Sequence, residues 1–234
     1  MRKFADIHLK LFEMNDAVLT RTAKLIRDMG IDIVGIVVPQ TLKQFEMSRI
    51  RTVLTKTGIN VATRVDLNPK NRNQLLSDLR SVRKRFEIVA VECRSHEVAA
   101  VACRDRRVDI ISLPINNRRI TYRMSLGGRY RASLEINVAE LISTGNLPRH
   151  VVLSRLRDVV SKVKSNHIPI VLSSGADNPL LLRAPREIAA IGTVLGMQSA
   201  EALDAVSTTP IAIVELNRKK LSHEYVTTGV KIER

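Results

Sequence analysis

The sequence predicts an α/β protein with a single domain, a distorted TIM-like (β/α) barrel of about seven to eight parallel strands. Short runs rich in β-branched residues alternate with segments of helical character along the chain. Strands that alternate with helices pair in parallel through right-handed crossovers. No linker or break in composition divides the 234 residues, so one domain is expected over 1–234. A doubly wound sheet is the alternative, but the sequence contains no Gly-rich dinucleotide-binding turn and no P-loop.

The expected elements follow one another in regular order over the first three quarters of the chain. Strands are predicted at residues 4–9, 31–38, 59–65, 87–91, 108–113, 133–137 and 169–174. Helices are predicted at residues 15–29, 41–56, 71–84, 95–106, 148–165, 185–196, 199–206 and 210–220. Asn15 or Asp16 provides the first N-cap, and Gly30 and Gly58 end the first two helices. The regular order then gives way to a helical C-terminal portion at about 179–220, in which no eighth strand is evident.

The charge of the chain indicates a polyanionic partner. The 38 Lys and Arg residues outnumber the 23 Asp and Glu residues, which gives a formal net charge of +15. Such an excess favours binding to nucleic acid or to an anionic membrane surface. Aromatic residues make up only 3% of the chain, which argues against proteins that hold single strands by base stacking. Contacts from a folded scaffold to phosphate groups fit this composition better.

The positive charge is concentrated in the middle of the sequence. Residues 80–131 hold 13 basic and 5 acidic side chains, a net charge of +8 in less than a quarter of the chain. The densest stretch, 116–131, follows the fifth predicted strand and is expected at the barrel end where loops form binding sites. Guanidinium groups bind phosphate in a bidentate manner, so this stretch is a candidate phosphate-binding segment, with a solvated loop as the alternative. Its arginines are Arg118, Arg119, Arg123, Arg129 and Arg131.

Two further basic groups lie at the ends of predicted helices, where the helix dipole alone favours cations. Charge changes in the first of these groups are therefore expected to matter less for phosphate binding. The first group consists of Arg80, Arg83, Lys84 and Arg85, and the second of Arg104, Arg106 and Arg107.

Arg64 and Arg94 differ from these groups because each falls at or just after the end of a predicted strand. An unpaired arginine inside a barrel is costly, so Arg64 is expected to point to an acid such as Asp6 or Glu92, or to a ligand. Arg94 is expected beside the 116–131 stretch, because strands four and five are neighbours in a sequential barrel. Both arginines join the candidate phosphate-binding residues.

Metal-dependent chemistry has weaker support. Asp6, His8, Glu92 and Asp177 lie at or after predicted strands and form the candidate ligand set for a binuclear phosphoesterase barrel. Such barrels need several histidines at one face, whereas no His-x-His occurs here and most histidines fall in or beside predicted helices. No metal and no other cofactor is therefore expected. The segment 173–177 is interpreted as a turn and helix cap, because no histidine is placed to activate its serines.

The sequence also suggests a compartment. No window approaches ~18 uninterrupted apolar residues, so no membrane-spanning helix is expected. The N-terminus contains Asp6 and His8 where a signal peptide needs an apolar core, and Cys93 and Cys103 are too few for a disulfide scaffold. A cytoplasmic protein is expected.

Six short motifs, taken in order and spacing, resemble the archaeal ribonuclease P protein component 3 family, which is related to a subunit of the eukaryotic nuclear enzyme. The resemblance covers essentially the whole chain. The motifs are Ala5-Asp6-Ile7-His8, Asp109-Ile110-Ile111-Ser112-Leu113-Pro114, Leu134-Glu135-Ile136-Asn137, Ile168-Pro169-Ile170-Val171-Leu172-Ser173-Ser174-Gly175-Ala176-Asp177, Arg183-Ala184-Pro185-Arg186-Glu187-Ile188, and Val226 with Gly229, Val230, Ile232 and Glu233.

The resemblance implies a distorted barrel and a subunit of the ribonucleoprotein that removes 5′ leaders from precursor tRNA. It implies that the RNA performs the chemistry, and that this chain pairs with protein component 2 and works with further protein subunits. The family is distantly similar to polymerase-and-histidinol-phosphatase barrels, which use metal ions. Asp6 stands at the first position of their His-x-His motif and the later histidine ligands are missing, which favours a scaffold.

The sequence thus predicts a basic barrel that binds the phosphates of structured RNA and has no catalytic residue of its own. The alternative is a stand-alone metal-dependent phosphoesterase that uses Asp6, His8, Glu92 and Asp177. Ribonuclease P RNA, protein component 2 and, through the complex, precursor tRNA are the expected partners, and no membrane is expected.

Overall fold

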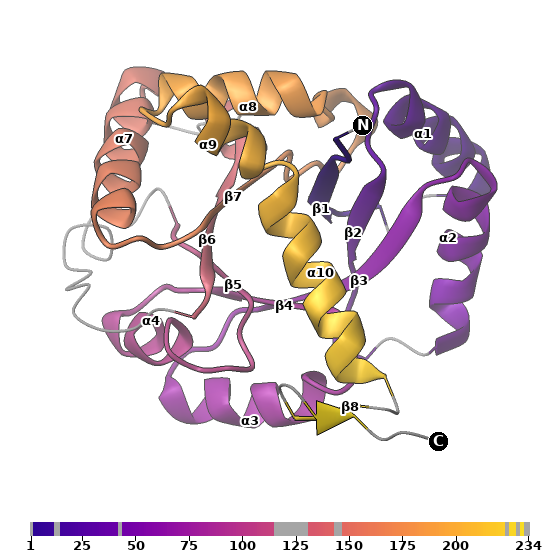
Figure 1. The fold of residues 1–234 in the computed structure, drawn as a ribbon, viewed down its shortest axis with the longest axis horizontal. Coiled ribbons are helices and arrows are strands. Elements are labelled where there is room, and N and C mark those ends of the chain that lie inside the picture. The colour runs from indigo at the N-terminus through magenta and orange to yellow at the C-terminus, as the bar shows by residue number, and fades with distance from the viewer. Residues whose placement is uncertain are drawn as a thin grey trace.

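The computed structural model describes residues 2–11, 15–41, 44–114, 131–142, 147–222, 225–227 and 230–231. Seven parallel strands form one sheet in sequential order and curl into a nearly closed barrel surrounded by helices, as the sequence predicts (Figure 1). The strands are β1 (Ala5–Leu9), β2 (Ile33–Val37), β3 (Asn60–Leu67), β4 (Ile88–Glu92), β5 (Ile110–Ser112), β6 (Ser133–Asn137) and β7 (Ile170–Ser173). A separate antiparallel pair is formed by β8 (Tyr225–Thr227) and β9 (Val230–Lys231).

The helices of the described residues alternate with the strands and then follow one another after β7. They are α1 (Asp16–Asp28), α2 (Gln44–Lys56), α3 (Arg72–Val82), α4 (His96–Ala102), α6 (Val138–Ile142), α7 (Arg149–Ser165), the 3₁₀ helix η1 (Pro179–Leu181), α8 (Pro185–Val194), α9 (Ser199–Asp204) and α10 (Thr208–Leu221). Side-chain caps define several starts, because Asn15 accepts a hydrogen bond from the Val18 N–H, and Asn71 accepts one from the Gln74 N–H.

Two irregular connections replace an eighth strand between β7 and β1. The Ala5 N–H donates to the Val206 carbonyl and the Leu172 N–H donates to the Ala205 carbonyl, so the segment before α10 is bonded to both edge strands. Further along, Leu9 forms a parallel bridge with Ala176. These contacts satisfy polar groups that a sheet edge would leave open. In the described part of the chain, the barrel is therefore nearly closed without a regular eighth strand.

The apolar core has two parts. The larger part lies between the outer faces of the strands and the surrounding helices. The smaller part fills the N-terminal half of the barrel interior with Ile7, Ile33, Ile88, Ile110 and other small or branched side chains. Helix α10 crosses the barrel and packs its buried Val214 against this inner layer, so the interior is closed at the end where the strands begin (Figure 1).

Three local features differ from the sequence-based expectation. The helix predicted at 95–106 ends at Ala102 as α4, because Asp105 bonds to the backbone N–H and side chain of Arg107 and forms a turn there. Helix α6 and the β8–β9 pair were not predicted. Within the described ranges, no helix has the length and apolarity needed to cross a membrane.

Candidate functional site

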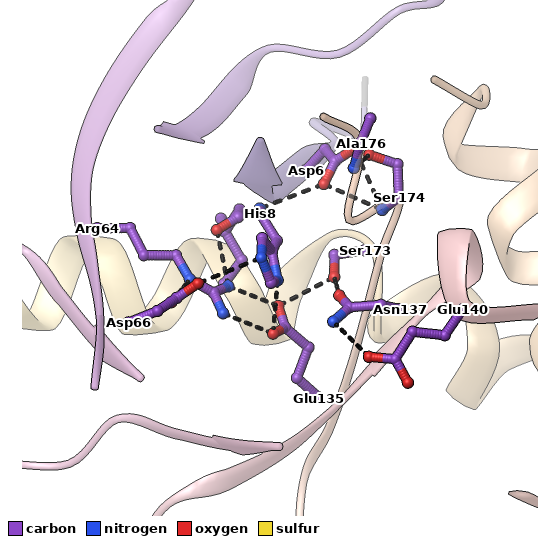
Figure 2. Close-up of polar contacts among 11 residues, drawn as sticks. Asp6, His8, Arg64, Asp66, Glu135, Asn137, Glu140, Ser173, Ser174 and Ala176 are labelled. Atoms are coloured by element: carbon purple, nitrogen blue, oxygen red, sulfur yellow. Dashed lines mark hydrogen bonds and ion pairs between the residues drawn. The ribbon is translucent and has the colours of Figure 1, made fainter. Parts of the chain in front are cut away.

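The barrel interior changes from apolar to polar toward the C-terminal ends of its strands. Along β3 the inward positions are Ala62, Arg64 and Asp66, since side chains on one face of a strand recur every second residue. Neighbouring strands contribute further polar side chains to the same place (Figure 2). The cluster, called the interior polar network below, consists of His8, Arg64, Asp66, Glu135, Asn137 and Ser173.

Arg64 lies at the centre of this network and is only 1% exposed. Its Nη1 and Nη2 atoms each lie 2.6 Å from one oxygen of Glu135, a bidentate ion pair between β3 and β6. Its Nε donates to Asp66 Oδ1 at 2.6 Å, and Nη1 also donates to the Ile7 carbonyl at 2.9 Å. The guanidinium therefore links three strands from inside the barrel.

His8 completes the charge balance of the network. Its Nδ1 lies 2.9 Å from Glu135 Oε2, and its Nε2 lies 3.3 Å from Asp66 Oδ2, an ion-pair distance without hydrogen-bond geometry. Burial and the Arg64 charge lower the pKa of His8, but the carboxylates of Glu135 and Asp66 outweigh them and raise it to about 9. His8 is therefore protonated at neutral pH, and two cations face two carboxylates.

The carboxylates of the network are held ionised. Burial alone would raise the pKa of Glu135, but the Arg64 and His8 charges outweigh it and lower the value to about 2. The same two cations hold the pKa of Asp66 well below its usual range, against the opposing effect of burial. Arg64 in turn stays charged, because these carboxylates outweigh its own burial and raise its pKa further.

Polar contacts continue on both sides of the network. The Ser173 hydroxyl lies 2.9 Å from Glu135 Oε1 and 2.6 Å from Asn137 Oδ1, and the Asn137 amide donates to Glu140. On the other side, Asp6 accepts hydrogen bonds from the Ser174 backbone N–H at 3.2 and 3.3 Å. Burial raises the pKa of Asp6 to about 6, since its hydrogen bonds only partly offset the loss of hydration.

The residues considered for a metal do not converge on one centre. Asp6 binds the Ser174 backbone, Glu92 pairs with Arg94 at 3.0 Å, and Asp177 accepts from the Asn178 amide. In the part of the chain that the structure describes, no group of three or more His, Cys, Asp or Glu side chains is placed to hold a metal ion. The Arg64 guanidinium binds both oxygens of Glu135, so the carboxylate that could have bound a metal ion already pairs with a cation. This side-chain set does not fit a metal-dependent phosphoesterase.

The structure corrects the role expected for Arg64. Its position is in the middle of β3, because the strand continues to Leu67, and its guanidinium faces the interior. Arg64 points to acids, as expected, but its partners are Asp66 and Glu135, and the two acids named from the sequence, Asp6 and Glu92, are wrong. A side chain buried in this way has no surface to offer RNA, and Arg64 is removed from the candidate RNA contacts.

Arg94 and Arg131 are both exposed, but they lie at opposite ends of the barrel. Arg94 follows the C-terminal end of β4 and pairs with Glu92. Arg131 lies just before β6, where its backbone N–H donates to the Cys103 carbonyl, so it belongs to the end where the strands begin. The expectation that Arg94 lies beside the 116–131 stretch is therefore wrong for Arg131. The other four arginines of the stretch, Arg118, Arg119, Arg123 and Arg129, lie outside the described residues.

Sequence reasoning missed Asp66, Glu135, Asn137 and Ser173 as members of one cluster. The spacing of Asp66 could have indicated it, because a residue two positions after Arg64 lies on the same face of the strand and can reach its guanidinium. Glu135 also carried a signal, since a single acid inside an apolar strand needs a buried cation. The pairing itself joins residues 71 positions apart, and no local pattern specifies it.

Fold and network together define a class of protein, a TIM-like barrel whose interior is closed at one end by a helix and filled at the other by paired charges. The chain matches the family model described as RNase P subunit p30 over residues 3–222, and it belongs to this family.

Curated relatives agree with this membership. Ribonuclease P protein component 3 of Methanothermobacter thermautotrophicus is 26% identical over 176 residues, which cover 74% of this chain and 71% of that protein. The protein of the same name from Methanosarcina barkeri is 24% identical over 234 residues, and the match covers 98% of this chain and 95% of that protein.

Solved structures show the same fold. A chain in the cryo-EM structure of archaeal ribonuclease P with mature tRNA superposes with a TM-score of 0.83 at 18% identity, covering 98% of both chains. A putative prolidase from Bifidobacterium longum superposes with a TM-score of 0.53 at 15% identity, covering 93% of this chain and 70% of that one. At these identities the likeness concerns the fold alone.

Proposed function

We propose that this chain supports the catalytic RNA of ribonuclease P, the ribonucleoprotein that removes 5′ leaders from precursor tRNA, as a basic scaffold. The observation that carries the proposal is the match to the RNase P subunit p30 family over residues 3–222. A net charge of +15 on a folded barrel provides the electrostatic attraction that RNA phosphates require. The protein raises activity by stabilising the folded RNA.

The interior polar network supports a scaffold role. In a catalytic carboxylate barrel, the acids at the C-terminal ends of the strands would be open to a metal ion or a substrate. Here Glu135 is in contact with Arg64, His8 and Ser173, and Asp66 forms ion pairs with Arg64 and His8. The network holds the strands together from inside the barrel, and the RNA contacts are left to the surface.

The expected partners follow from this role. They are the ribonuclease P RNA, protein component 2 and further protein subunits, with precursor tRNA reached through the complex. We place the complex in the cytoplasm, where the buried free thiols of Cys93 and Cys103 stay reduced. The arginines proposed to contact RNA are Arg94, Arg118, Arg119, Arg123, Arg129 and Arg131.

Reconstitution tests the proposal. Ribonuclease P RNA is combined with protein component 2, with and without this chain, and cleavage of precursor tRNA is measured. We expect the chain to increase cleavage by the complex and to cleave no RNA by itself in the presence of Mn²⁺ or Zn²⁺. Cleavage by the isolated chain that is lost in Asp6→Ala would contradict the scaffold role and support a phosphoesterase.

A further inference from the structure

A group of exposed basic side chains lies along the barrel end where β4, β5 and β6 begin. Helix α3 ends just before β4, α4 ends just before β5, and the chain enters β6 from Arg131. Because these parallel strands are neighbours in the sheet, the segments that precede them lie side by side (Figure 1). The group, called the α3–α4 basic surface below, consists of Arg80, Lys84, Arg85, Arg104, Arg106 and Arg131.

Hydrogen bonds between the three segments fix this surface. Arg83 donates to Asp109 at 2.6 Å and to the Arg107 carbonyl at 3.2 Å, which ties the end of α3 to the turn after α4. The Arg131 N–H donates to the Cys103 carbonyl at 2.9 Å, which ties the third segment to the end of α4. The six basic residues are therefore carried on a backbone that is already ordered, so little backbone freedom is lost on binding.

The two acids between α4 and β5, Asp105 and Asp109, are already engaged. Asp109 pairs with Arg83 at 2.6 Å, and Asp105 pairs with Arg107 at 2.7 Å. Both of these arginines are only partly exposed and do not belong to the surface group. The C-terminal dipoles of α3 and α4 together offset only about one elementary charge, against six exposed cations. The helix dipole therefore does not account for the basic cluster at 80–85, contrary to the expectation from the sequence.

The chemistry of the surface favours phosphates of RNA over a lipid membrane. The apolar side chains between the basic residues, Val82, Phe86 and Val108, are buried. Amphipathic helices that bind membrane surfaces carry exposed apolar side chains beside their basic ones, and among its described residues this surface shows none. Five of the six cations are arginines, whose planar guanidinium groups match phosphate geometry. Fixed cations on adjacent segments can follow successive phosphates of a structured strand.

We propose that the α3–α4 basic surface is a phosphate-contact surface through which this chain binds structured RNA; the inference rests on the function proposed above. The contacts are to the backbone and independent of base identity. They lie at the N-terminal end of the barrel strands, opposite to Arg94 and to the end at which sequence reasoning placed the RNA.

The test compares two triple variants of the full chain. The first is Arg80→Gln, Lys84→Gln and Arg106→Gln. The matched control is Arg21→Gln, Lys24→Gln and Arg186→Gln, which removes the same charge from exposed positions on α1 and α8. Binding to the ribonuclease P RNA transcript is measured at several salt concentrations. We expect the first variant to lose about tenfold or more in affinity and to reduce the slope of log affinity against log salt by about 2 to 3, and the control to lose much less.

A second measurement uses the unaltered chain. Acetylation of lysine amines is compared with and without the RNA, and we expect protection of Lys84 and no protection of Lys24. Equal losses in both triple variants, or an unprotected Lys84 in a chain that binds the RNA, would overturn the α3–α4 surface and leave the proposed function intact. Failure of the unaltered chain to bind the RNA would overturn both. Binding to vesicles of anionic lipid that is lost in the first variant, without a change in RNA affinity, would assign the surface to a membrane.

Discussion

Glu135 has four polar contacts inside the barrel, two from Arg64 and one each from His8 and Ser173. Its side chain has no exposed surface, so water cannot replace a partner that is lost. A buried ion pair contributes little to stability relative to apolar packing, but removal of one partner leaves an uncompensated charge. The network therefore makes the barrel sensitive to changes at single residues.

Glu135→Gln is expected to lower the free energy of unfolding by about 3 to 5 kcal/mol, because the buried Arg64 loses its paired carboxylate. Urea denaturation measures the effect. Glu215→Gln, at an exposed position on α10, serves as a matched control and is expected to change the value by about 0.5 kcal/mol or less. Equal stabilities of the two variants would contradict a structural role for the network.

His8 predicts a loss of stability at alkaline pH. Its pKa is about 9 in the folded protein and 6.5 in the unfolded chain, so the folded state holds the proton more tightly. The stabilisation is fully present below pH 6.5 and is lost as pH rises through about 9. The free energy of unfolding is expected to fall by roughly 3 kcal/mol over this range, at about 1.4 kcal/mol per pKa unit.

Urea denaturation at a series of pH values checks this prediction, with His8→Gln as the comparison. The variant is expected to show a much flatter profile between pH 6.5 and 9. Asp6 does not interfere, because its pKa rises from 3.8 only to about 6 and it titrates below this window. An unchanged alkaline decline in His8→Gln would show that another group is responsible.

At the scale of elements, the path of β1 depends on a glycine in β2. The register between the two strands shifts between Asp6 and Leu9, and the Ile7 backbone lies against Gly35. A Cβ atom at position 35 would lie 2.7 Å from the Ile7 Cα and carbonyl carbon. Because the Ile7 carbonyl also accepts from Arg64, this close approach helps to place the interior polar network.

Gly35→Ala is expected to lower the free energy of unfolding by about 1 to 3 kcal/mol or more, since two strand backbones must separate to admit the methyl group. Gly30→Ala is the matched control. Gly30 has a φ of +76°, and a methyl group there would meet no other atom within 4 Å, so this control isolates conformational strain of about 1 to 2 kcal/mol. A larger loss in urea stability for Gly30→Ala than for Gly35→Ala would contradict the proposed collision.

At the scale of the whole molecule, positive charge is concentrated in more than one region of the chain. The 116–131 stretch carries five arginines, and the α3–α4 basic surface shares Arg131 with it. Long-range attraction depends on the sum of these charges, whereas the tight contacts depend on where they lie. Comparison of variants in the two regions separates these contributions.

Neutralisation of Arg118, Arg119 and Arg123 to Gln is expected to weaken assembly with RNA by a few kcal/mol, at roughly 1.5 to 3 kcal/mol per charged hydrogen bond lost. Affinity for RNA should also fall linearly with salt on a log–log scale, with a slope of about −0.7 to −0.9 per phosphate contact. Binding titrations at several salt concentrations measure both effects, and thermal unfolding checks that stability is unchanged. Unchanged assembly and precursor-tRNA cleavage would remove this segment from the RNA-contact surface.

Local patterns in the sequence were enough to predict the barrel. Runs of β-branched residues, caps such as Asn15 and Asn71, and stop signals such as Gly30 act over a few residues, so they can be recognised without a structure. The net charge and its concentration in 80–131 are likewise properties of composition. The sequence by itself therefore determined the fold class, most element positions, and the preference for a polyanionic partner.

Only the tertiary structure decided which residues meet. Arg64 lies 71 positions from Glu135 along the chain, and Ala205 and Val206 bond to strands at both ends of the sheet. Contacts of this kind depend on how the sheet closes, and closure depends on the packing of all its strands together. The same reason explains why Arg131 lies at the opposite end of the barrel from Arg94. Arg94 follows a strand and Arg131 precedes one, and in a parallel barrel these two positions lie at opposite ends, whatever their distance along the sequence.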